Sequence, residues 1–108
     1  VAAPEHLATL LRVQLVLGET RDAKETLAKL KLAAPNTWLA VSEEARYLAR
    51  VGNKKEAARL ASATSGPDAA EHLAARVGPL LEEIGCPVDA EAAYKKALES
   101  AKTPTAHV

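Results

Sequence analysis

The chain of 108 residues lacks most of the features that mark disulfide-framed, membrane-spanning or aromatic-rich proteins. It has no Phe, no Met, two Tyr and one Trp, and its single cysteine excludes an internal disulfide framework. Lys plus Arg equal Asp plus Glu at 14 each, so there is no net field to draw it to nucleic acid or anionic membranes. No apolar run approaches the roughly 20 residues of a spanning helix, so membrane insertion is not expected.

Alanine and leucine dominate what is present, with 24 and 15 copies respectively. A core made from small and medium aliphatic side chains favours closely packed helices over a sheet of β-branched and aromatic residues. The length is sufficient for a single domain. We therefore predict an all-α fold with one repeat domain over residues 1–102.

One sequence pattern occurs three times. It consists of an aliphatic residue, Gly, three variable residues, an acidic residue and Ala, over residues 17–23, 51–57 and 84–90. The three glycines, Gly18, Gly52 and Gly85, are separated by 34 and 33 residues. A fixed period of this length is the signature of stacked supersecondary units.

Apolar residues at helical spacing flank each of these glycines. Upstream of the first glycine they are Leu7, Leu10, Leu11 and Leu17, and downstream Ala23, Leu27 and Leu30. A glycine that tolerates positive φ ends the first helix of each pair. We predict helices over residues 4–17, 20–33, 37–51, 54–63, 68–84 and 88–101, with Pro79 kinking the fifth without breaking it. Residues 103–108 show no periodicity and are predicted to be a flexible tail.

A helix–turn–helix unit of about 34 residues resembles the tetratricopeptide repeat family. In the first unit Gly18, Ala23, Leu27, Leu30 and Pro35 match the family pattern. The resemblance implies a right-handed superhelix of three hairpins, with units at about 4–37, 38–67 and 68–102. The departures are Leu11 where the family favours a small residue, Glu44 where it is usually apolar, and an early end of the second unit at residues 65–67.

The resemblance also implies a peptide-binding groove lined by the first helix of each hairpin. The family's carboxylate clamp is absent: at its places stand Ala8, Arg12, Glu43, His72 and Arg76, and only Arg76 matches in type. Arginine forks suit carboxylates, so an acidic peptide with apolar anchors is the expected ligand. The predicted peptide-binding residues are Arg12, Leu15, Leu39, Arg46, Arg50 and Arg76. The alternative is that Glu43 and Glu82 neutralise these arginines in a solvated surface network.

No enzyme chemistry is expected from the sequence. The three histidines, His6, His72 and His107, share no metal-ligand spacing with Cys86, and we expect no metal and no cofactor. Cys86 precedes the last helix, where it is either a reactive thiol or a small residue at a helix start. Trp38 is interpreted as a packing residue at a repeat junction, with a ligand anchor as the alternative.

The leading hypothesis is a non-catalytic protein–protein interaction module, excised from a longer chain. The alternative is a self-association module that forms a homo-oligomer through its terminal helices, where Ala90, Ala93 and Ala97 offer a small-residue face. Nucleic-acid binding is not expected, because the net charge is zero and aromatic residues do not recur as stacking positions. The single thiol fits a cytoplasmic setting, with a periplasmic or membrane-tethered parent protein left open.

Overall fold

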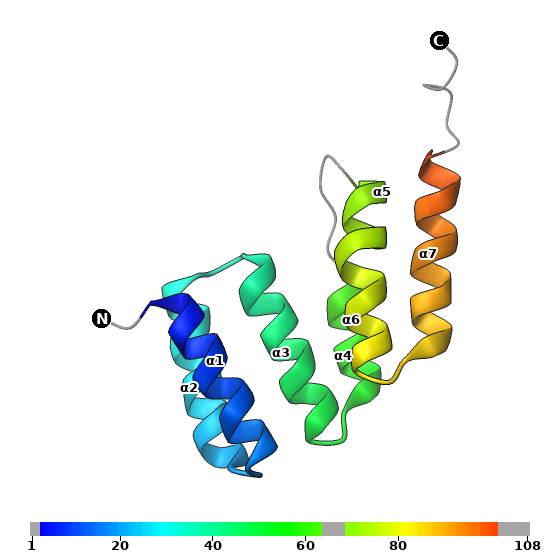
Figure 1. Cartoon of the computed structure of the whole chain (residues 1–108). Coiled ribbons are helices and arrows are strands. Elements are labelled where there is room, and N and C mark those ends of the chain that lie inside the picture. The colour runs from blue at the N-terminus through cyan, green and yellow to red at the C-terminus, as the bar shows by residue number, and fades with distance from the viewer. Residues whose placement is uncertain (1–2, 64–68, 102–108) are drawn as a thin grey trace. The chain divides into compact units, whose positions relative to one another are not determined.

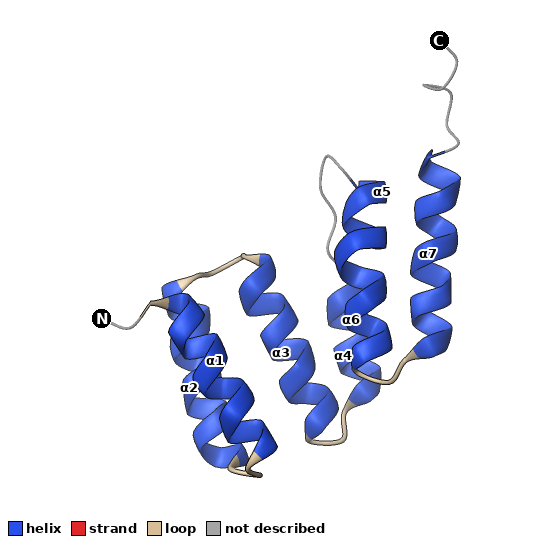
Figure 2. Ribbon diagram, in the orientation of Figure 1, coloured by secondary structure: helices blue, strands red, loops and turns tan. Residues whose placement is uncertain are grey.

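The computed structural model describes residues 3–63 and 69–101. All regular structure in these two stretches is helical (Figures 1 and 2), which confirms the predicted all-α class. The elements are α1 (Pro4–Val16), α2 (Thr20–Ala33), α3 (Trp38–Arg50), α4 (Lys54–Ser62), α5 (Ala69–His72), the π-helical turn η1 (Leu73–Val77), α6 (Gly78–Glu83) and α7 (Pro87–Ala101). The predicted break at residues 65–67 and the predicted tail at 103–108 lie outside the described residues.

The chain divides into two compact units, one ending at Ala57 and the other beginning at Ala58. The boundary falls inside α4 and does not coincide with the expected repeat boundaries. The first unit contains α1, α2 and α3, and the second contains α5, η1, α6 and α7.

The three repeated glycines end their helices in the same way. Gly18, Gly52 and Gly85 have φ values of 78°, 93° and 83°, in the left-handed region that glycine adopts without a Cβ penalty. In each turn the amide of the following residue donates to a carbonyl five residues earlier. These bonds run from Glu19 to Gln14, from Asn53 to Leu48 and from Cys86 to Leu81, each at 2.8 Å. The glycine amide bonds three residues back at 3.1–3.2 Å, which completes a Schellman motif in all three turns.

Two apolar clusters hold the first unit together. The first consists of Leu11, Leu15, Ala23 and Leu27, with Tyr47 of α3 packed against it. The second consists of Leu7, Ala8, Leu30 and Ala40, with Leu39 packed against it. The buried face of α1 is therefore the row spaced by four residues that contains Leu7, Leu11 and Leu15. Leu10 and Leu17, predicted as members of the apolar face, are 47% and 64% exposed, so that part of the prediction is wrong.

The helix before the third turn runs through Pro79 with a change of helical type. Residues 69–83 form α5, η1 and α6 in succession, and the Gly78 amide bonds the Leu73 carbonyl in π-helical register. Proline has no amide for the carbonyl four residues back, and a π-helical turn absorbs this irregularity without ending the helix. The predicted continuation through Pro79 is therefore confirmed.

The small-residue face of α7 is already used inside the second unit. Ala90, Ala93 and Ala97 are 1–6% exposed, and α7 contacts α5, η1 and α6. These alanines pack within the unit, so the expectation that they dock another molecule is wrong.

We predict that Ala57→Asp is among the most damaging single substitutions. Ala57 is 0% exposed, so the new carboxylate would be buried without a partner, at a cost on the order of several kcal/mol. Urea unfolding monitored by circular dichroism measures the loss. Lys55→Asp, two residues earlier at an exposed position, is the control and is expected to change stability by less than about 1 kcal/mol. An unchanged midpoint for Ala57→Asp would contradict the close packing at this position.

Candidate functional site

A buried carboxylate on α3 joins two arginines from different helices. The Nε of Arg12 on α1 donates to Oε1 and Oε2 of Glu43 at 3.2 and 2.9 Å, and its Nη2 donates to the same Oε2. Nη1 of Arg46, one helical turn after Glu43, donates to Oε2 at 2.7 Å. The predicted convergence of Arg12 and Arg46 is therefore confirmed, with Glu43 lying between them.

Burial differs sharply among the three groups. The Glu43 side chain is 0% exposed, whereas those of Arg46 and Arg12 are 21% and 54% exposed. No buried side-chain nitrogen or oxygen among the described residues lacks a hydrogen-bond partner. A carboxylate removed from water is tolerated only when its charge and lone pairs are satisfied, and the two guanidinium groups do this here. Two positive charges surround one negative charge, so the cluster carries one excess positive charge on the side that faces solvent.

Polar contacts link the remaining helix pairs of the first unit. Thr26 Oγ1 on α2 donates to Gln14 Oε1 on α1 at 2.7 Å. Lys31 Nζ on α2 bonds Glu44 Oε2 on α3 at 3.0 Å. The second pair explains why an acid stands at the position that the tetratricopeptide pattern usually keeps apolar.

The structure changes the placement of several predicted peptide-binding residues. Leu15 is 5% exposed and belongs to the α1–α2 core, which corrects its expected place in a groove. Arg46 is half-buried and holds Glu43, so the expectation that it is an exposed and freely reversible position is wrong. Leu39 is half-buried against the Leu7 cluster. Arg50 is exposed at the end of α3 in the first unit, and Arg76 is exposed on η1 in the second.

Sequence reasoning assigned Glu43 to a surface and missed its burial. Its neighbours gave a partial signal, because Arg46 lies three residues later on the same helix and Arg12 occupies the equivalent place one repeat earlier. The carboxylate itself lies among α3 residues of which Ser42 and Ala45 are also buried.

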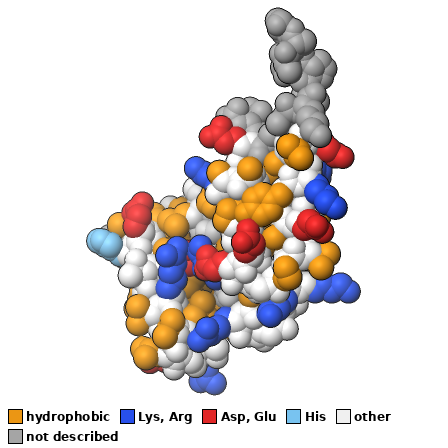
Figure 3. All heavy atoms as spheres, turned by 45° about the vertical axis from the view of Figure 1, so that its right-hand side comes forward, with side chains coloured by type: hydrophobic (Ala, Val, Ile, Leu, Met, Phe, Trp, Pro, Cys, Tyr) orange, Lys and Arg blue, Asp and Glu red, His pale blue; other side chains and the backbone are white. Residues whose placement is uncertain are grey.

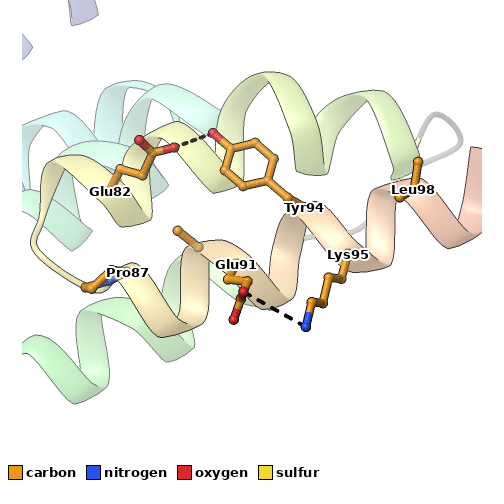
Figure 4. A pocket seen from close by; sticks show the side chains of 7 residues that line it. Glu82, Pro87, Glu91, Tyr94, Lys95 and Leu98 are labelled. Atoms are coloured by element: carbon orange, nitrogen blue, oxygen red, sulfur yellow. Dashed lines mark hydrogen bonds and ion pairs between the residues drawn. The ribbon is translucent and has the colours of Figure 1, made fainter.

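An open depression lies between α6 and α7 in the second unit. It has a volume of about 460 Å³ and is lined by Glu82, Pro87, Ala90, Glu91, Tyr94, Lys95 and Leu98 (Figure 4). Tyr94 points from α7 toward α6, where its hydroxyl donates to Glu82 Oε2 at 2.6 Å (Figure 4). Hydrophobic side chains also reach the surface among acidic and basic ones in the view of Figure 3.

Glycine at position 78 makes room for the Tyr94 ring. A Cβ built on Gly78 would lie 2.5 Å from Tyr94 Cζ, which is far inside van der Waals contact. The phenol therefore lies directly against the backbone of α6. Its hydrogen bond to Glu82, together with partial burial and the negative charge of that carboxylate, raises the pKa of Tyr94 above its ordinary value.

Two further residues singled out from the sequence are located by the structure. Cys86 is 9% exposed and directly precedes α7, as expected for a small residue at a helix start. Trp38 is half-buried at the first position of α3, and its proposed junction role stays a prediction. Within residues 3–63 and 69–101, no three His, Cys, Asp or Glu side chains are grouped closely enough to hold a metal ion. None of the helices in these stretches has the length and apolar character needed to span a membrane.

Comparison of the chain with protein-family models, with curated proteins and with solved structures found no significant match.

We predict that Glu43→Gln destabilises the first unit by about 2–3 kcal/mol, less than a fully buried pair because Arg12 is half-exposed. The amide removes the only negative charge between two guanidinium groups and leaves their repulsion uncompensated. The neighbouring Glu44→Gln is the matched control, and its exposed pair with Lys31 is expected to contribute less than about 1 kcal/mol. Urea denaturation compares the two, and equal losses would contradict a structural role specific to Glu43.

We predict that the second unit loses stability as the pH rises above about 10, the ordinary pKa of tyrosine. The folded state raises the pKa of Tyr94, so it retains a proton that the unfolded chain releases, and the free energy of unfolding falls with increasing pH. Glu82→Gln is expected to lower the pKa of Tyr94, whereas Glu99→Gln on the same helix leaves it unchanged. Nuclear magnetic resonance titration of isotope-labelled tyrosine measures this, and an unshifted Tyr94 in the parent chain would contradict the hydrogen bond.

Proposed function

We propose that this chain is a non-catalytic protein–protein interaction module built as a tetratricopeptide-like superhelix of three helical hairpins. The observation that carries the proposal is the threefold recurrence of one turn. The same Schellman motif stands at Gly18, Gly52 and Gly85, and each is followed by a helix whose first buried residue is an alanine. Repeated hairpins of this kind form extended surfaces that bind other polypeptides.

The face that carries the arginine cluster is the best candidate for the peptide-binding surface. Arg12 is 54% exposed, Arg50 is exposed at the end of α3, and the Arg12–Glu43–Arg46 cluster carries one excess positive charge. Val16, 71% exposed at the end of α1, offers an apolar contact beside these charges. A short acidic peptide with aliphatic side chains matches both features.

The roles within this surface differ from those expected from the sequence. Leu15 belongs to the core and Arg46 positions Glu43, so Arg12, Arg50 and Val16 are the residues proposed to meet the peptide, with Leu39 at the margin. Arg76 stays a proposed contributor from the second unit.

The test uses a fluorescent peptide of alternating Glu and Leu residues, titrated with the intact chain. We predict weak binding, roughly −7 to −8 kcal/mol, as is usual for short peptides on shallow surfaces. Arg50→Glu is expected to weaken it at least tenfold, because the substitution turns an exposed attractive charge into a repulsive one. Lys24→Glu, the same charge reversal at an exposed position on α2, is the control and should have little effect.

Circular dichroism and thermal unfolding of both variants establish that the fold is kept. Binding that responds equally to Arg50→Glu and Lys24→Glu would show a non-specific charge effect. Binding lost only on substitution of Lys95, on α7, would move the working surface to the outer helices and overturn this assignment.

A further inference from the structure

In the first unit, α3 packs on the surface formed by α1 and α2. Tyr47 packs against the cluster that contains Leu11, Leu15 and Leu27, and one turn earlier Glu44 bonds Lys31 on α2. These two side chains of α3 therefore mark the surface that a helical hairpin presents to the next helix.

The depression in the second unit occupies the equivalent surface. The first and third glycines are 67 residues apart, as 85 minus 18 shows, and the same shift relates Leu15 to Glu82, Leu27 to Tyr94 and Lys31 to Leu98. All three of these later residues line the depression between α6 and α7 (Figure 4). The surface that α3 covers on the first hairpin is thus open on the last one, where Leu98 is 57% exposed.

A second exposed apolar surface lies on α1. Leu10, Val13 and Leu17 follow one another at helical spacing and are 47%, 49% and 64% exposed. A shift of 34 residues relates Leu10 to Glu44 and Val13 to Tyr47, the two side chains with which α3 packs on the first hairpin. The side of α1 that would pack on a preceding hairpin is therefore apolar and exposed.

The two exposed surfaces are complementary position by position. Inside the first unit, Glu44 meets Lys31, and the residues at the equivalent places on the two exposed surfaces are Leu10 and Leu98. An ion pair is replaced by an apolar pair, with both members changed together. Val13 likewise takes the place of Tyr47, opposite the bulky Tyr94 in the place of Leu27. A smaller side chain on one surface thus faces a larger one on the other.

We propose that the depression between α6 and α7 binds α1 of a second copy of this chain, so that copies associate head to tail. The contact repeats the packing of α3 on α1 and α2, with Leu10 against Leu98 and Val13 against Tyr94. It is a heterologous interface, because each copy contributes a different surface, and it adds copies in an open series. The inference rests on the proposed repeat arrangement but does not depend on the peptide-binding surface.

Sedimentation equilibrium of the intact chain and two single variants tests the proposal. The parent chain is expected to exceed its monomer mass of 11.4 kDa as concentration rises. Val13→Glu spoils only the donor surface and Leu98→Glu only the acceptor surface, so each alone should associate at least roughly tenfold more weakly. Leu32→Glu, at an 84% exposed apolar position on α2, is the matched control and should associate like the parent chain.

Mixing the two variants gives the decisive result. The Leu98→Glu copy retains its α1 surface and the Val13→Glu copy retains its depression, so the mixture should form a dimer with one copy of each and grow no further. Circular dichroism checks that all variants keep the parent helicity. A parent chain that stays monomeric, a mixture that stays monomeric, or an equal effect of Leu32→Glu would overturn the proposal. Peptide titrations are performed on the monomeric variants, so failure of assembly and failure of peptide binding are distinguished.

Discussion

The first unit depends on a single charge that is removed from water. Glu43 is 0% exposed and is stabilised by guanidinium groups from α1 and from its own helix. A buried carboxylate left without partners costs far more than an apolar substitute would, so the position strongly restricts how α3 lies against α1. The neighbouring apolar clusters supply non-directional burial free energy, whereas this contact requires a particular register of the two helices.

The same reasoning separates the two kinds of polar contact around α3. Lys31 and Glu44 are partly exposed and solvated, and their pairing adds little to the stability of the unit. Arg12 and Arg46 serve a buried group and also turn charge toward solvent. A structural role and a recognition role can therefore reside in the same side chains, which explains why a charge reversal at Arg46 would not report on binding alone.

The sequence predicted the helices because their signals are local. Glycines at 34- and 33-residue spacing, apolar periodicity and Pro79 are read within a few turns, and the predicted helices correspond to those described. The faces of the helices were predicted less well. Leu10 and Leu15 are the same residue type on one helix, and only the packing of α2 and α3 decides that Leu15 is buried and Leu10 exposed. Burial of Glu43 likewise depends on a partner 31 residues away.

The close contact between Gly78 and Tyr94 has a consequence for how this sequence can change. The two positions share one volume, since a methyl group at position 78 would meet the phenol ring at 2.5 Å. In the first unit the equivalent pair is Leu11 and Leu27, which divides the same space into two medium side chains. Neither position can be exchanged between the units alone without a collision or a void. Substitutions at these sites should therefore be inherited in pairs, and a large residue at 78 and a tyrosine at 94 should exclude one another.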